Sequence, residues 1–121
     1  MVPKKILVID DEPDIRKTLQ ARLRSSGYAV TLAEDGEEGL QKVRSEKPDL
    51  VLLDIMMPKT DGWKVLKAIR DDETTRELPV IMLTAKGETS SVSDWQRRQA
   101  TDYFVKPFDD KELLRFISRY V

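Results

Sequence analysis

The sequence predicts an α/β fold in one domain: a three-layer, doubly wound parallel sheet of five strands with helices on both faces. Two observations predict it. Five short, mainly apolar segments recur along the 121 residues, and amphipathic helical patterns separate them. Strands that alternate with helices form right-handed βαβ units, which make the sheet parallel. The expected domain is residues 1–121, without an internal repeat or linker.

Continuous apolar runs mark the strands, as is typical of strands buried on both faces of a parallel sheet. The run at 50–53 stops at a carboxylate, Asp54, and Pro58 then prevents further pairing. Asp61 and Gly62 signal a turn or a helix start. The expected strands are 5–9, 28–32, 50–53, 79–83 and 102–105.

Apolar residues at helical spacing mark the helices between the strands. Ile15, Leu19 and Leu23 form one stripe on a helix that starts at Pro13 and is closed by Gly27. A fourth helix is expected over residues 91–99, although few of its residues are apolar. The other helices bury Leu40 and Val43; Trp63, Val65, Leu66 and Ile69; and Leu113, Phe116, Ile117 and Tyr120.

Composition excludes several classes of function. The chain has no cysteine and no histidine, so thiolate metal sites, disulfides and histidine-based catalysis are absent. With 21 basic and 22 acidic residues, its net charge of -1 favours neither nucleic acid nor an anionic membrane. There is no apolar run of membrane-spanning length and no signal-peptide core, so we expect a cytoplasmic protein.

Charged or hydroxyl residues end four of the five strands: Asp10 and Asp11, then Asp54, Thr84 and Lys106. Each alone has an ordinary explanation as a cap, a turn residue, a buried hydroxyl or a surface lysine, but capping does not explain the set. The carboxyl ends of parallel strands share one edge, so three mutually repelling carboxylates meet there. Mg²⁺ prefers such oxygen ligands, and beside a lysine and a hydroxyl it suits a phosphoryl group.

With these residues, the chain resembles the CheY-like receiver domain of two-component response regulators. The matching motifs are Asp10-Asp11, residues 54–62 from Asp54 to Gly62, Thr84-Ala85, Tyr103 and Lys106-Pro107. The resemblance covers the whole chain. It implies a flavodoxin-like fold with strand order 2-1-3-4-5.

The resemblance also implies the chemistry of the site. Asp54 is the expected phosphoacceptor in a Mg²⁺-dependent reaction. Asp11, Asp54 and the backbone carbonyl of Met56 would bind Mg²⁺, with Asp10 acting through water. Lys106 would pair with phosphoryl oxygens.

Switching and partners follow from the same resemblance. Thr84 would move to hydrogen-bond the phosphoryl group, Tyr103 would swing inward behind it, and the Lys106-Pro107 peptide would be cis. The phosphodonor would be a sensor histidine kinase or a histidine phosphotransfer protein. The sequence of residues 84–88 is similar to that of the receiver subfamily whose members precede winged-helix DNA-binding domains. Output would pass to an effector domain or a self-dimer, through the face formed by the fourth helix, fifth strand and fifth helix.

The fourth helix departs from the family pattern. Gln99 stands where the family usually has glycine, and Ser93 and Gln96 stand where it usually has apolar residues. The apolar residues here are Val92 and Trp95. We therefore expect a helix that is rotated from the family orientation and is the least protected in the unphosphorylated protein.

Two alternative functions differ in class. A Mg²⁺-dependent aspartyl-phosphatase would need a second aspartate two residues after the nucleophile, where Met56 stands. A receiver-like interaction module without phosphotransfer would be expected to have lost some of the strand-end residues, and all of them are present. Glycine-rich nucleotide-binding motifs are absent.

Overall fold

The computed structural model describes residues 2–85 and 99–121. Its five strands form one parallel sheet in the order β2-β1-β3-β4-β5, so the predicted fold class and strand order are confirmed. The strands are β1 (Lys5–Ile9), β2 (Ala29–Ala33), β3 (Leu50–Asp54), β4 (Val80–Ala85) and β5 (Asp102–Lys106). The described helices are α1 (Pro13–Ser25), α2 (Gly36–Glu46), α3 (Gly62–Asp71) and α5 (Asp110–Ile117).

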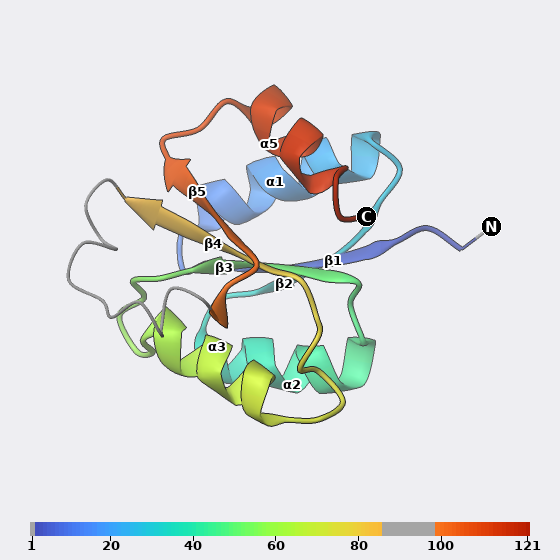
Figure 1. Cartoon of the computed structure of the whole chain (residues 1–121). Helices are drawn as coiled ribbons and strands as arrows, with labels where there is room; N and C mark the ends of the chain where they lie inside the picture. The colour runs from blue at the N-terminus through green and yellow to red at the C-terminus, as the bar shows by residue number, and fades with distance from the viewer. Residues whose placement is uncertain (1, 86–98) are drawn as a thin grey trace.

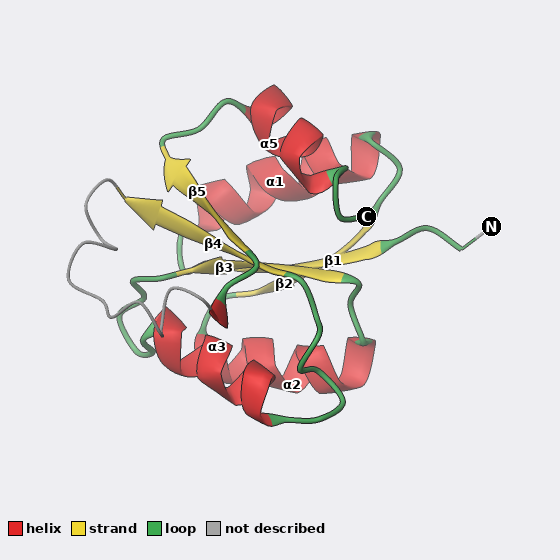
Figure 2. Cartoon of the chain, viewed as in Figure 1, coloured by secondary structure: helices red, strands yellow, loops and turns green. Residues whose placement is uncertain are grey.

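Helices cover both faces of the sheet, with α1 and α5 on one side and α2 and α3 on the other (Figure 1). Figure 2 shows the strands as the middle of three layers. Successive residues of a strand point to opposite faces, and β1 therefore supplies both cores. Leu7 and Ile9 belong to the apolar cluster that includes Trp63 and Leu66 of α3, whereas Ile6 and Val8 belong to the cluster of α1 and α5.

Aspartates cap three of the described helices. Asp35, Asp61 and Asp109 each accept a hydrogen bond from a backbone N–H in the first turn of α2, α3 and α5. The N-cap of α1, Glu12, makes no such side-chain bond. Instead Asp10 Oδ1 accepts the Glu12 N–H at 2.9 Å, so the carboxylate at the end of β1 also fixes the start of α1.

The expected helix over residues 91–99 falls almost entirely outside the described residues, and so do Val92, Ser93, Trp95 and Gln96. Its rotation and low protection therefore remain predictions. β2 begins at Ala29, one residue later than expected, and Tyr28 packs against the core on the α1 and α5 side. In residues 2–85 and 99–121, no helix combines the length and apolar character of a membrane span.

Candidate functional site

Lys106 joins the carboxylates at the carboxyl edge of the sheet. It ends β5, and its Nζ lies 2.9 Å from Asp10 Oδ2, 3.4 Å from Asp54 Oδ1 and 3.8 Å from Glu12 Oε1. Since β4 lies between β5 and β3, and β3 lies beside β1, the lysine side chain reaches across the end of β4. The structure thus brings together residues that are up to 96 positions apart in sequence.

Asp10 is fully buried and tightly held. Its N–H donates to the Ala33 carbonyl at 3.1 Å, its Oδ1 accepts from Glu12 N, and its Oδ2 accepts from Lys106 Nζ. A buried carboxylate is stable only when it is paired and hydrogen-bonded in this way. Asp10 is therefore a fixed negative charge beside Asp54.

Asp54 is 5% exposed, and its pKa is raised from 3.8 to about 7. Burial is the main cause, the charge of Asp10 and a side-chain hydrogen bond with Asp11 act in the same direction, and Lys106 lowers the pKa in part. The net effect is a carboxyl group whose ionisation is costly in the absence of another positive charge.

Lys106 responds in the opposite sense to the same neighbours. Burial by itself lowers the pKa of this amine, but the hydrogen bond and charge of Asp10 and the charges of Asp54 and Glu12 outweigh burial. The pKa of Lys106 is therefore raised, and the ammonium stays charged. A permanent cation at this point can stabilise negative charge that develops on Asp54 or on a group bound to it.

The acidic cluster fits a hard cation. Carboxylate oxygens of Asp10, Asp11 and Glu12 all lie within 4.8 Å of one another. Oxygen ligands at this density, next to a carboxylate with a raised pKa, are the donor set that Mg²⁺ prefers. Glu12 was not among the ligands predicted from sequence, although its position directly after the aspartate pair was a signal for it.

The loop that follows Asp54 is held close to β3. Met56 pairs with Asp61 across this loop, and Gly62 N donates to the Ile55 carbonyl at 2.8 Å. A Cβ at Gly62 would collide with the carbonyl oxygen of Asp54, which explains the glycine there. Met56 is 67% exposed, so it contributes little to the core.

The two predicted switch residues lie on neighbouring strands. Thr84 is buried near the end of β4, one residue beyond the partner of Asp54 in the β3–β4 register. The partly buried ring of Tyr103 packs against Trp63, with ring centroids 6.2 Å apart and planes at 51°. The predicted cis peptide between Lys106 and Pro107 is confirmed.

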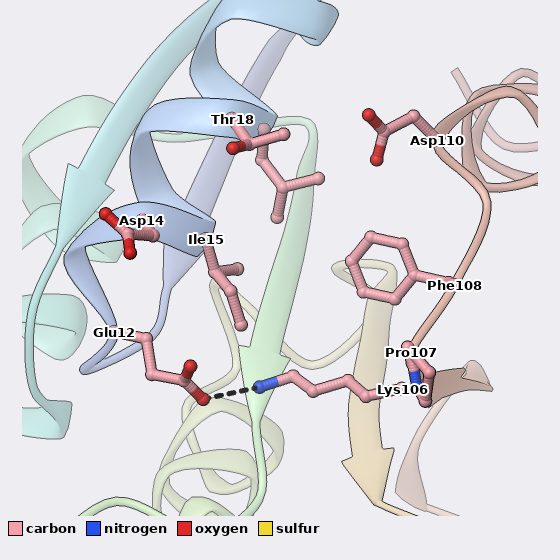
Figure 3. A pocket seen from close by; sticks show the side chains of 9 residues that line it. Glu12, Asp14, Ile15, Thr18, Lys106, Pro107, Phe108 and Asp110 are labelled. Carbon is pink, nitrogen blue, oxygen red and sulfur yellow. Dashed lines mark ion pairs between the residues drawn. The ribbon is translucent and has the colours of Figure 1, made fainter.

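A pocket of about 470 Å³ opens beside Lys106, between α1 and the loop that leads into α5. Figure 3 shows Ile15 and Thr18 of α1 facing Phe108 across it, with the Glu12–Lys106 ion pair at one end. Carboxylates of Asp14 and Asp110 also line it. The pocket therefore has apolar walls and an acidic rim, and it leads to the lysine of the site.

The family model of the response regulator receiver domain matches residues 6–118. The chain therefore belongs to the receiver domain family. This receiver domain is similar in structure to the chemotaxis response regulator CheY4 of Vibrio cholerae, with a TM-score of 0.89, 30% identity, and coverage of 99% of this chain and 100% of that one. A putative response regulator from Chloroflexus aurantiacus gives a TM-score of 0.88 and 34% identity over 98% and 97% of the two chains.

Its sequence relatives include regulators of transcription. The PhoP regulator of alkaline phosphatase synthesis from Bacillus subtilis is 47% identical over 110 residues, which are 91% of this chain and 45% of that protein. The probable transcriptional regulator ycf27 of Guillardia theta is 49% identical over 91% of this chain and 42% of its own length. The receiver thus spans less than half the length of these relatives.

Proposed function

We propose that residues 1–121 form a phosphoacceptor domain that takes a phosphoryl group onto Asp54 from a histidine kinase or a histidine phosphotransfer protein in the cytoplasm. The observation that carries the proposal is the position of the Asp54 carboxylate, 3.4 Å from Lys106 Nζ and beside a cluster of three further carboxylates. This arrangement places a nucleophile, Asp54, beside one fixed cation, the Lys106 ammonium, and beside carboxylates that could bind a second cation.

Mg²⁺ is the second cation that we propose, bound by Asp11, Asp54 and the Met56 carbonyl, with Asp10 acting through water. When bound, it would supply positive charge that offsets the repulsion between the carboxylates. Glu12 lies close enough to Asp10 and Asp11 to belong to the same site. Lys106 would then help to keep the Asp54 carboxylate ionised and oriented.

The reaction transfers a phosphoryl group from a histidine nitrogen of the donor to a carboxylate oxygen of Asp54. A carboxylate oxygen of Asp54 attacks phosphorus, an acyl phosphate bond forms, and the bond from phosphorus to the donor nitrogen breaks. The Lys106 ammonium moves from its carboxylate partners to the phosphoryl oxygens, which it stabilises. Thr84 donates its hydroxyl to the same oxygens, and Tyr103 moves inward as Thr84 vacates its position.

The pocket beside Lys106 is where we propose that the phosphodonor protein docks. It opens next to the reacting groups, and its apolar walls, Ile15 and Phe108, could take apolar side chains of a partner helix. The acidic rim, which includes Asp14 and Asp110, would favour a partner with basic residues around its phosphohistidine. Because the relatives are transcriptional regulators, we propose that the signal passes to a DNA-binding effector domain or through a self-dimer, and that the receiver itself makes no contact with DNA.

Mass spectrometry after incubation with a small phosphodonor and Mg²⁺ tests the proposal. We expect a mass increase of one phosphoryl group in the wild type and none in Asp54→Asn. Asp61→Asn is the matched control, because asparagine can still cap α3 and the variant should be phosphorylated normally. Phosphorylation of Asp54→Asn at the wild-type rate would refute the assignment. An aspartyl-phosphatase would instead release phosphate catalytically from a phosphate ester, and the exposed Met56 offers no acid for that step.

A further inference from the structure

Arg16 of α1 links two loops at the carboxyl edge of the sheet. Its Nη1 donates to the backbone carbonyl of Asp10 at 2.6 Å, and its Nη2 lies 3.8 Å from Glu34 Oε2, just after β2. The Arg16 side chain is only 15% exposed, whereas that of Glu34 is 68% exposed. The hydrogen bond of Arg16 to Asp10 is therefore shielded from solvent, whereas its ion pair with Glu34 lies at the surface.

The bond to the Asp10 carbonyl completes a set of contacts around that residue. The Asp10 N–H and both of its carboxylate oxygens are bonded to Ala33, Glu12 and Lys106, as described above. Arg16 holds the remaining polar group, the carbonyl. Rotation of this peptide would redirect the N–H of Asp11, and with it the position of the Asp11 carboxylate.

We infer that Arg16 is a positioning residue for the acidic cluster: it holds the Asp10–Asp11 peptide so that their carboxylates present one cation-binding face. A guanidinium suits this role, because its rigid planar fork can bind a carbonyl and a carboxylate at the same time. The inference rests on the proposed function, since it assumes that these carboxylates bind Mg²⁺. Mutation of a residue that contacts a metal ligand typically weakens metal binding 10- to 100-fold.

Charge and positioning predict opposite effects, which makes the inference testable. Arg16 carries a positive charge near the cation site, so its charge alone would weaken Mg²⁺ binding by repulsion. If charge were its whole contribution, Arg16→Met would bind Mg²⁺ more tightly than the wild type, and Arg16→Lys would bind it equally well. If Arg16 positions the ligands, both variants would bind more weakly, and Met more weakly than Lys.

Isothermal titration with MgCl₂, together with melting temperatures in EDTA, separates these cases. We expect the dissociation constant to rise about 10-fold in Arg16→Met and less in Arg16→Lys. The exposed Lys17 is adjacent in α1, so Lys17→Met removes a charge without touching Asp10 and should leave the constant within about twofold. Unchanged or tighter binding in Arg16→Met would overturn the inference, as would a lower melting temperature with an unchanged constant.

Two further comparisons ensure that the experiment either supports or refutes the inference. If Arg16→Met does not fold, Arg16→Lys decides alone: weaker binding than in the wild type supports positioning, and equal binding overturns it. A wild-type protein that shows no saturable Mg²⁺ binding would refute the proposed function together with this inference. Normal wild-type binding with unaffected Arg16 variants would refute only the inference.

Discussion

At the carboxyl end of the sheet, Lys106 contacts three carboxylates, whereas at the amino end Arg70 of α3 contacts neutral acceptors. Arg70 Nε donates to the Gln99 carbonyl at 2.7 Å, Nη1 donates to the Leu78 carbonyl at 2.7 Å, and Nη2 donates to Thr101 Oγ1 at 3.3 Å. Thr101 Oγ1 also accepts from Val80 N, so Arg70 is tied to the start of β4.

The two ends of the sheet differ in what their polar contacts do. Those at the amino end stabilise the fold, and those at the carboxyl end leave negative charge that a ligand can neutralise. Backbone carbonyls satisfy the half-buried guanidinium of Arg70 without bringing like charges together, so this contact needs no ligand to complete it. At the carboxyl end Asp10, Glu12 and Asp54 share Lys106, and Asp11 lies beside them. The raised pKa of Asp54 reflects its burial and this excess of negative charge. We therefore expect a bound cation or phosphoryl group to change the stability contributed by the carboxyl end and to leave that of the amino end unchanged.

The pH dependence of stability should show the largest effect. Between about pH 4 and pH 7 the folded, metal-free protein keeps a proton on Asp54 that the unfolded chain has lost. Unfolding then releases a proton, and the free energy of unfolding falls as pH rises through this window, by at most about 1.4 kcal/mol per pH unit.

Urea denaturation in EDTA across this range measures the effect. Asp54→Asn should lose this part of the pH dependence and be more stable than the wild type at pH 7.5. Parallel curves for the two proteins would show that Asp54 ionises as an ordinary exposed aspartate.

Breaking the amino end should be costly at every pH. Arg70→Ala leaves the carbonyls of Gln99 and Leu78 without their donor, and we expect a loss of about 3 kcal/mol in the free energy of unfolding. Arg76→Ala is the matched control: its side chain is exposed, and the change should stay within about 0.5 kcal/mol. A loss in Arg70→Ala that depended on Mg²⁺ would contradict the separation of the two ends.

Mg²⁺ should stabilise the protein only through the carboxyl end. At 100 times the dissociation constant, mass action raises the free energy of unfolding by about 2.7 kcal/mol. Asp11→Ala should lose most of this increase, and relief of repulsion should make its metal-free form at least as stable as the wild type. Melting curves with and without Mg²⁺ measure both effects, and an equal Mg²⁺ response in the two proteins would exclude Asp11 as a ligand.

The sequence predicted the carboxyl end better than the amino end, for a physical reason. Strand-end residues such as Asp54 and Lys106 are placed by the alternation of strands and helices, so their convergence follows from topology alone. At the amino end the main acceptors of Arg70 are backbone carbonyls, which every residue carries and which leave no mark in the sequence. The same holds at the carboxyl end for the Asp10 carbonyl that accepts from Arg16. Glu12 could not be assigned from the sequence either. Its contact with Lys106 depends on the conformation of the loop between β1 and α1.

The smallest expected effect concerns a second paired group at the amino end. Tyr120, beyond the end of α5, donates its hydroxyl to Asp102 Oδ2 at 2.9 Å, at the first residue of β5. Tyr120→Phe keeps the ring contact with Phe116 and removes only this bond, so the free energy of unfolding should fall by about 1 kcal/mol. Because the bond lies far from the carboxylates, the loss should be the same in EDTA and in saturating Mg²⁺. Urea denaturation under both conditions is the measurement, and a loss confined to one of them would mean that the two ends of β5 are energetically coupled.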